Sequence, residues 1–247
     1  MIQVKNVTVS FDEIKVLDNI SFEVPEKGNL VVLGKNGSGK SVLLKSIAGL
    51  INTSEGFIEI DNVKAGPELY ENGASERSTV GYVFQKGGLF DSMTVAENIA
   101  FGMLRKKYDR SVIDKKIEEV LVSVGLAGSG EKYPSELSGG MQKRVSLARC
   151  LCLEPKIMLY DDPAAGLDPV LTDSVADLIL AIRESAAITS VTVTHDLKFA
   201  RKIADTVILL YGGKIACMLE VEDFFSKKDP YAKQFIEGSD VGPIDLF

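Results

Sequence analysis

The sequence lacks any apolar run that could span a membrane. Hydrophobic stretches such as Leu30–Leu33 and Val207–Leu210 fall far short of the roughly 20 residues that a spanning helix needs. The first residues, Met1–Val4, have neither the basic and apolar regions of a signal peptide nor the Arg- and Ser-rich character of a transit peptide. We therefore expect a chain that does not cross a membrane and stays where it is made.

Basic residues and cysteines are also in short supply. Lys and Arg number 28 against 35 Asp and Glu, for a net charge of -7, and no block of basic residues offers a surface for nucleic acid. The three cysteines are an odd number, and Cys150 and Cys152 lie two positions apart in a helical pattern, where side chains do not face each other. We interpret them as reduced core thiols rather than as a metal or redox site.

What the sequence does contain is a regular succession of strand and helix patterns. Alternating apolar residues over 2–24 predict an antiparallel β opening, and Leu30–Leu33, a Gly-rich loop and Ser41–Leu50 read as strand, loop and helix. Residues 61–79 read as a loop. Strands alternating with helices predict an α/β fold with a mostly parallel sheet covered on both faces. The remaining expected helices are 109–124, 138–153, 174–185 and 197–204, and the remaining strands are 80–84, 157–160, 190–193 and 207–211.

A phosphate-binding loop pattern, Gly-x-x-x-x-Gly-Lys-Ser, stands between an expected strand and helix. Its glycines let backbone N–H groups turn toward a phosphate, the helix N-terminus adds a positive dipole end, and Lys40 adds a full charge. Ser41 would ligate Mg²⁺. A glycine-rich turn without a ligand would share the pattern but not the context. The predicted nucleotide-binding residues of this loop are Gly34, Asn36, Gly37, Ser38, Gly39, Lys40 and Ser41.

An acidic residue closes the apolar strand Ile157–Tyr160. Asp161 at this point would bring a carboxylate to Mg²⁺ beside the γ-phosphate of a bound nucleotide. A buried strand followed by an Asp that caps a helix would look the same. Only the phosphate-binding loop favours the magnesium interpretation.

The stretch Leu137–Arg144 reads Leu-Ser-Gly-Gly-Met-Gln-Lys-Arg, which resembles the signature of ATP-binding-cassette (ABC) ATPases. The resemblance covers nearly the whole chain and implies an ABC-type P-loop NTPase fold with an N-terminal antiparallel β part and a helical subdomain. It also implies that Ser138, Gly139 and Gly140 bind the γ-phosphate of an ATP held by a second protomer, as a helix N-terminus can. A capped helix alone would not explain two glycines at its start.

Four further positions match the family's functional residues. The resemblance implies that Gln85 senses Mg²⁺ and the attacking water, that Asp168 lies in the loop through which two protomers signal, and that His195 contacts the γ-phosphate. It implies that Phe11 stacks on adenine. A lone histidine is more often structural, and a strand-end Phe could equally belong to the core, but His195 follows an expected parallel strand, where such sheets place ligands.

One residue departs from the family pattern. The resemblance places a Glu directly after the magnesium-site Asp, and this chain has Asp162 there. An aspartate can polarise the attacking water but reaches about one methylene less far, and a displacement near 1 Å can cost on the order of 10²-fold in rate. We take Asp162 as the catalytic base; a site that binds ATP and hydrolyses it poorly is the alternative.

The resemblance also divides the chain and gives it partners. It implies a single ABC ATPase domain over 1–247, with a core formed by about 1–84 and 156–220, a helical subdomain at about 85–155 and a C-terminal helix and tail at about 221–247. It implies ATP and Mg²⁺ as cofactors, a second copy in a head-to-tail dimer and a membrane permease. The expected location is the inner face of the cytoplasmic membrane.

Local features suggest a substrate class. Three local features resemble the ATPases of Mla-type (Mce-associated) phospholipid transporters. They are the small residues at 87 and 88 before Leu-Phe, Met141 in the signature and the ending 235–243. This resemblance implies an Mce-domain protein and a small STAS-domain protein as partners, and we expect the tail 244–247 to pack on a partner chain. The alternatives are the ATPase of an amino-acid or metal importer, and an ABC scaffold without a transport role.

Overall fold

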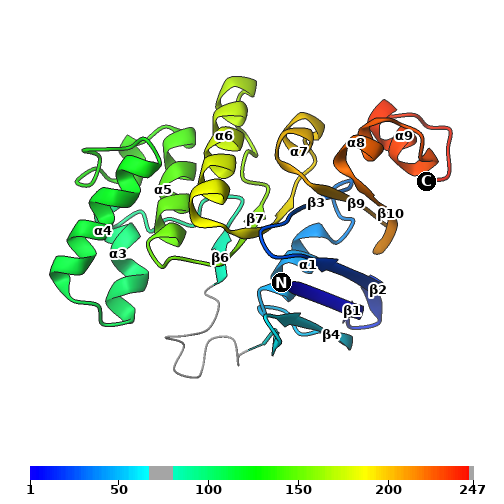
Figure 1. Cartoon of the computed structure of the whole chain (residues 1–247), viewed down its shortest axis with the longest axis horizontal. Helices are drawn as coiled ribbons and strands as arrows, with labels where there is room; N and C mark the ends of the chain where they lie inside the picture. Colours follow the sequence, from blue (N-terminus) through cyan, green and yellow to red (C-terminus); the bar gives the residue numbers. More distant parts are fainter. Residues whose placement is uncertain (67–79, 245–247) are drawn as a thin grey trace. The chain divides into compact units, whose positions relative to one another are not determined.

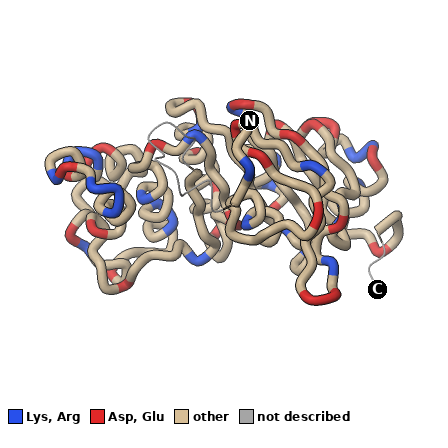
Figure 2. The backbone as a smooth tube through the Cα atoms, turned by 90° about the horizontal axis from the view of Figure 1, so that it is seen from below, with Lys and Arg blue, Asp and Glu red and all other residues tan. Residues whose placement is uncertain are grey.

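The structure, a computed structural model, describes residues 1–66 and 80–244. The chain divides into two units: Met1–Ser78 together with Ala187–Phe247, and Thr79–Ala186 (Figure 1). Basic and acidic positions are interspersed along the described backbone of each unit (Figure 2). Among the described helices, none combines the length and the hydropathy that crossing a bilayer requires.

An antiparallel sheet opens the first unit, as the alternating apolar residues predict. Its strand order is β2-β1-β4-β5, and Ile2 pairs with both Val24 and Ile60. Asp61 and Asn62 join β4 to β5 with φ of 48° and 63°, the left-handed conformation that a two-residue hairpin turn needs. The strands of this sheet are β1 (Ile2–Phe11), β2 (Ile14–Val24), β4 (Glu55–Ile60) and β5 (Val63–Lys64).

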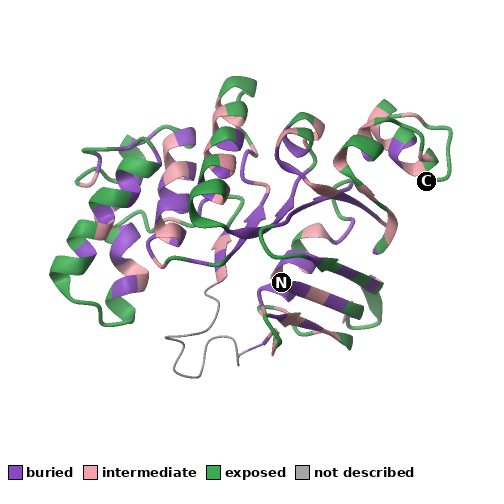
Figure 3. Ribbon diagram, in the orientation of Figure 1, coloured by how far each residue is buried: buried purple, intermediate pink, exposed green. Residues whose placement is uncertain are grey.

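Parallel strands form the core of the same unit, in the order β10-β9-β3-β8. β3 (Asn29–Leu33) runs parallel to both β8 (Thr189–Val193) and β9 (Thr206–Tyr211), and β10 (Lys214–Glu220) pairs antiparallel with β9. β3 and β8 are buried along their whole length, as expected of strands covered on both faces (Figure 3). Helices α1 (Lys40–Ile47), α7 (Leu197–Ile203), α8 (Val221–Phe225) and α9 (Pro230–Glu237) complete the unit.

The second unit is mainly helical. It contains the parallel pair β6 (Val80–Val83) and β7 (Ile157–Asp161). In α4 the buried residues Ile113, Ile117 and Leu121 recur every four positions, the spacing of one helix face. The helices are α3 (Val95–Arg105), α4 (Arg110–Ser123), the short η1 (Pro134–Glu136), α5 (Gly139–Leu151) and α6 (Pro169–Ala186).

Most of the expected elements are found, with four kinds of difference. The helix expected at 174–185 is longer, because α6 starts at Pro169. Part of the loop expected at 61–79 is the strand β5, and residues 67–79 lie outside the described part. β4, β10 and α3 were not among the expected elements. The division into units places both β6 and β7 with the helical residues, in Thr79–Ala186, whereas the expected helical subdomain covers about 85–155.

The C-terminal segment folds back on its own chain. The buried side-chain amide of Gln234 in α9 accepts a hydrogen bond from the Ile244 N–H at 2.7 Å and donates one to the Ile244 carbonyl at 3.0 Å. Ile244 is only 5% exposed. The expectation that this residue packs on a partner chain is therefore wrong, and residues 245–247 lie outside the described part.

Candidate functional site

The phosphate-binding loop connects β3 to α1 in the first unit. A Cβ on Gly34 would lie 2.4 Å from the Leu210 carbonyl oxygen and 2.6 Å from the Ser38 hydroxyl oxygen, so no larger residue fits there. Gly39 has φ +100°, and its Cβ would meet a methyl group of Leu17 at 2.8 Å. Two positions of the pattern therefore require glycine for steric reasons within this chain.

Two side chains of the loop fit a polyphosphate. The Ser38 hydroxyl is buried and has no hydrogen-bond partner among the described residues, which is costly for a polar group unless a ligand supplies one. The Lys40 ammonium donates to the carbonyls of Gly34 and Lys35 at 2.7 and 2.9 Å, which holds its charge over the loop. Lys40 also starts α1, so the loop ends at a helix N-terminus, a favourable place for an anion.

His195 and Phe11 lie in the same unit as the loop. His195 is exposed and directly follows Thr194 at the end of β8, and β8 is a parallel neighbour of β3. The carboxyl ends of these two strands therefore bring His195 and the phosphate loop to one edge of the sheet. Phe11 ends β1 with 47% of its surface exposed, so the alternative that it is a core residue is wrong.

The acidic pair lies in the second unit, at the end of β7. Asp161 is buried and accepts a hydrogen bond from the Tyr82 hydroxyl of β6 at 3.0 Å. Burial and the neighbouring Asp161 raise the pKa of Tyr82, so its hydroxyl stays a donor. Asp162 has φ +46°, a left-handed conformation in which Asp and Asn are several-fold enriched. The backbone at this position is thus of a kind that suits aspartate.

Gln85 is an exposed residue in the loop between β6 and α3, and α5 holds the backbone of this loop. The Lys143 ammonium donates to the Gln85 carbonyl, and the Ser146 hydroxyl donates to the Gly87 carbonyl at 2.8 Å. At the other end of the loop, the buried Asn98 accepts from the Phe90 N–H and donates to the carbonyls of Phe90, Met93 and Thr94. The loop is therefore anchored at both ends within its unit.

The signature residues form a helix start. Ser138 is the N-cap of α5, and its hydroxyl accepts from the Met141 N–H at 3.3 Å. Asp168 likewise accepts from the N–H groups of Val170 and Leu171, both at 2.9 Å, at the start of α6. Capping accounts for Ser138 and Asp168 as structural residues. It does not account for Gly139, which is exposed, where a Cβ would make only an ordinary contact at 3.8 Å with Leu167.

The structure thus gathers the expected residues in two sets. The phosphate loop and His195 share one sheet edge in the first unit, and Asp161 and Asp162 share one strand end in the second. Sequence reasoning missed Tyr82, Asn98 and Lys143. Only Lys143 had a signal, since it stands in the signature, and its partner Gln85 is 58 positions away in the sequence.

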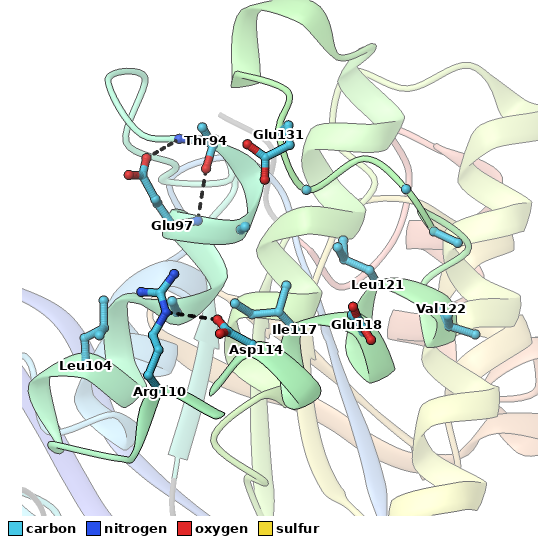
Figure 4. Close-up of a pocket in the computed structure, with 15 residues that line it drawn as sticks. Thr94, Glu97, Leu104, Arg110, Asp114, Ile117, Glu118, Leu121, Val122 and Glu131 are labelled. Carbon is cyan, nitrogen blue, oxygen red and sulfur yellow. Dashed lines mark hydrogen bonds and ion pairs between the residues drawn. The ribbon is translucent and has the colours of Figure 1, made fainter. Parts of the chain in front are cut away.

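The cysteines and one cavity of the second unit are not part of the candidate site. Cys150 and Cys152 are free and buried, as expected, and no His, Cys, Asp and Glu cluster among the described residues could hold a metal ion on its own. A cavity of about 740 Å³ lies between α3, α4 and the segment 127–131. In Figure 4 Glu97, Asp114 and Glu118 line it beside apolar side chains. None of the expected site residues lines this cavity.

Comparison with known proteins identifies the family. A sequence model described as ABC transporter matches residues 17–165. The glutamate transport ATP-binding protein GluA of Corynebacterium efficiens is 40% identical over 96% of this chain and 98% of its own length. The probable ribonucleotide transport ATP-binding protein mkl of Mycobacterium leprae is 37% identical over 99% of this chain and 71% of its own length. The methionine import ATP-binding protein MetN of Clostridium tetani is 35% identical over 98% of this chain and 76% of its own length.

The similar solved structures are ABC proteins, as the sequence relatives are. The dimeric post-hydrolysis state of the ATP-binding cassette MJ0796, bound to ADP and Pi, has a TM-score of 0.78 and 31% identity, over 90% of this chain and 99% of that one. The cbiO1 protein of Clostridium perfringens has a TM-score of 0.82 and 27% identity, over 95% and 94%. The expected fold class, an α/β cassette with an antiparallel N-terminal sheet and a helical part, is confirmed. The chain belongs to the ABC transporter family and is one of its ATP-binding, ATP-hydrolysing cassettes.

Proposed function

We propose that this chain is the motor subunit of an ABC transporter that moves phospholipid, acting on the inner face of the cytoplasmic membrane. The observation that carries the motor role is the phosphate loop, with its sterically required glycines and the buried Ser38 hydroxyl, which has no hydrogen-bond partner in the described part of the chain. Similarity to transport ATP-binding proteins over nearly the whole chain supports the role.

The residues of the two sets have complementary parts in hydrolysis. Lys40 and the loop amides bind the phosphates, Phe11 covers the adenine and His195 holds the γ-phosphate. The Asp162 carboxylate accepts the proton of the attacking water, and Gln85 orients that water. Ser41, Asp161 and Gln85 would hold Mg²⁺, which would neutralise charge that develops on the phosphate oxygens. Almost all of this catalysis is positioning and electrostatics.

A second copy of the chain completes the site in this proposal. The helix start at Ser138, Gly139 and Gly140 offers N–H groups to the γ-phosphate of the ATP held by the other copy, and the Asp168 loop lies at the same contact. The exposure of Gly139 supports this arrangement, as do the solved dimers of the similar cassette MJ0796. Binding of two ATP molecules closes the dimer, and hydrolysis lets it open.

A membrane permease is the other necessary partner. In the second unit a cavity of about 330 Å³ opens beside the Gln85 loop, and its lining includes Tyr82, Phe84 and Phe90. Phe84 and Phe90 are 40% and 41% exposed, so the cavity carries uncovered aromatic surface. Such a site suits an apolar segment of a partner, and its position next to Gln85 would couple docking to the nucleotide.

The phospholipid assignment is supported by the loop that follows Gln85. Gly87 and Gly88 have φ of 75° and 61°, which proline cannot adopt, so this loop differs from the Pro-containing stretch of many solute importers. The resemblance of Met141 and the ending 235–243 to Mla-type ATPases also supports the phospholipid assignment. The proposed partners are then a permease, an Mce-domain protein that handles phospholipid and a small STAS-domain protein.

Import of an amino acid is the second candidate, because GluA and MetN are among the relatives. Extraction of the chain from its native membrane in mild detergent, followed by identification of its partners and of bound lipid, separates the candidates. We expect a permease and an Mce-domain protein with phospholipid. Copurification of a solute permease without lipid would support solute import instead of phospholipid transport. Copurification of no membrane protein would support an ABC scaffold without a transport role.

A further inference from the structure

Lys143 is a buried charge that the proposed hydrolytic residues do not include. It is the sixth residue after Leu137 in the signature stretch and lies on α5, with 8% of its surface exposed. Removing an ammonium group from water is costly, so a buried lysine is expected to have partners that compensate its charge.

Three residues of the proposed site interact with Lys143. Its ammonium donates a hydrogen bond to the Gln85 carbonyl, and Asp162 and Asp161 act on it electrostatically. Burial lowers the pKa of Lys143, and the two carboxylates oppose that shift by favouring the charged form. One side chain of the signature helix therefore contacts the backbone of the proposed water-orienting residue and interacts electrostatically with the proposed magnesium-site acid and base.

Lys143 is also the first member of a row on α5. Ser146 donates to the Gly87 carbonyl at 2.8 Å, and the Arg149 guanidinium donates to the carbonyls of Gly88 at 2.6 Å and Gly87 at 3.1 Å. Positions 143, 146 and 149 follow the three-residue spacing of one helix face. Hydrogen bonds from three side chains thereby hold the backbone of the loop 85–88 against the helix that begins with the signature.

We propose that Lys143 is a positioning residue for ATP hydrolysis, which ties the backbone of Gln85 to α5 and orients the carboxylates of Asp161 and Asp162 with its charge. The proposal rests on the assignment of these three residues to the hydrolytic site, but not on the transported substrate. The phosphate loop is in the other unit, where the Lys40 ammonium donates to the carbonyls of Gly34 and Lys35.

Four variants of the full chain test the proposal through phosphate release and ATP affinity, measured separately. We expect K143M and K143Q to lower kcat at least about 10-fold with ATP affinity changed less than about 2-fold, and K143R to keep at least a third of kcat. K115M, which removes an exposed lysine of the same unit, should match the wild type. Wild-type kcat in K143M or in the uncharged K143Q would overturn the proposal, as would an equal loss in K143R.

A spectroscopic measurement supplies a readout independent of turnover. The chain has no tryptophan, so F84W places a single reporter next to Gln85. In this background we expect K143M to raise acrylamide quenching of the reporter at least about 2-fold and to lower its anisotropy, because the loop loses its tie to α5. Identical quenching with and without Lys143 would show that the loop does not need it. Far-UV circular dichroism establishes that each variant is folded. If K143M does not fold, K143Q replaces it in the quenching measurement.

D161N in the same assays distinguishes a wrong assignment of the hydrolytic site from a wrong role for Lys143. If D161N hydrolyses ATP at the wild-type rate, the assignment of the acidic pair is wrong and the basis of the proposal with it. If D161N is inactive while K143M is fully active, the site stands and only the role of Lys143 is refuted. Loss of activity in both, with the reporter mobile in K143M, is the expected result.

Discussion

At the scale of single residues, the proposed role of Asp162 as catalytic base can be tested directly. Its φ of +46° suits Asp and Asn better than longer side chains, so Asn is a close match in both shape and backbone preference. We expect D162N to lower kcat at least about 10²-fold, while ATP affinity and thermal stability stay at the wild-type level. Phosphate release, calorimetric ATP binding and a thermal melt measure the three quantities. Unchanged turnover would mean that another group polarises the water.

Phe11 allows an equally local test, because its exposure leaves it little structural role. If its ring stacks on adenine, F11A removes a contact of about 0.5–1.5 kcal/mol, which corresponds to roughly 2- to 12-fold weaker ATP binding. Ile14 lies on the same hairpin and is 71% exposed, so I14A is the matched control and should bind normally. Equal affinity in F11A and I14A would remove Phe11 from the site.

The buried thiols make a prediction about pH. Burial raises the pKa of Cys150 to about 11 and that of Cys152 to about 12. Because the folded chain keeps these protons and the unfolded chain releases them near pH 8.5, their contribution to stability is complete below that pH. It is lost as pH rises toward the folded pKa values. We expect denaturant midpoints to fall between about pH 9 and 11, and C150A/C152A to fall less steeply. Parallel pH curves for both proteins would contradict this.

At the scale of elements, the sequence predicts what is locally periodic and misses what depends on distant pairing. The strand β3 is visible as an apolar run, α4 through its apolar spacing and α5 through the Ser138 cap. β10 is half exposed and has an irregularity between Ile215 and Cys217, which breaks the alternation that would reveal it. The site divides in the same way: the phosphate loop is contiguous in sequence, whereas the contact of Lys143 with Gln85 exists only once α5 packs on the loop.

The C-terminal element offers a prediction of its own. The Gln234 amide on α9 is the hydrogen-bond partner of both backbone groups of Ile244. Q234L removes that partner and leaves two buried groups unsatisfied, at a cost of about 1–3 kcal/mol each if they stay buried. We expect the segment after Gly238 to detach, so that limited proteolysis there becomes at least about 10-fold faster while ATP turnover is unchanged. Wild-type proteolysis rates in Q234L would show that Ile244 is held by its apolar contacts alone.

At the scale of the whole molecule, Gly139 tests the proposal that a second copy of the chain completes the site. No described residue requires a glycine there, since an added Cβ would lie 3.8 Å from Leu167. Alanine is favoured over glycine inside helices by about 1 kcal/mol, so G139A should leave the monomer at least as stable. In an ATP-sandwich dimer, however, the methyl group would lie between the helix start and the partner's nucleotide.

We therefore expect G139A, placed in the D162N background where ATP persists, to weaken ATP-dependent dimerisation at least about 10-fold without lowering the melting temperature. Sedimentation with ATP and Mg²⁺ measures the dimer. G130A is the matched control, because Gly130 has the same freedom, with Ala96 at 3.6 Å as the nearest atom to an added Cβ. Equal dimerisation of G139A and G130A would mean that the partner's nucleotide does not reach this helix start. A lower melting temperature in G139A would instead mean that the chain needs the glycine for its own folding.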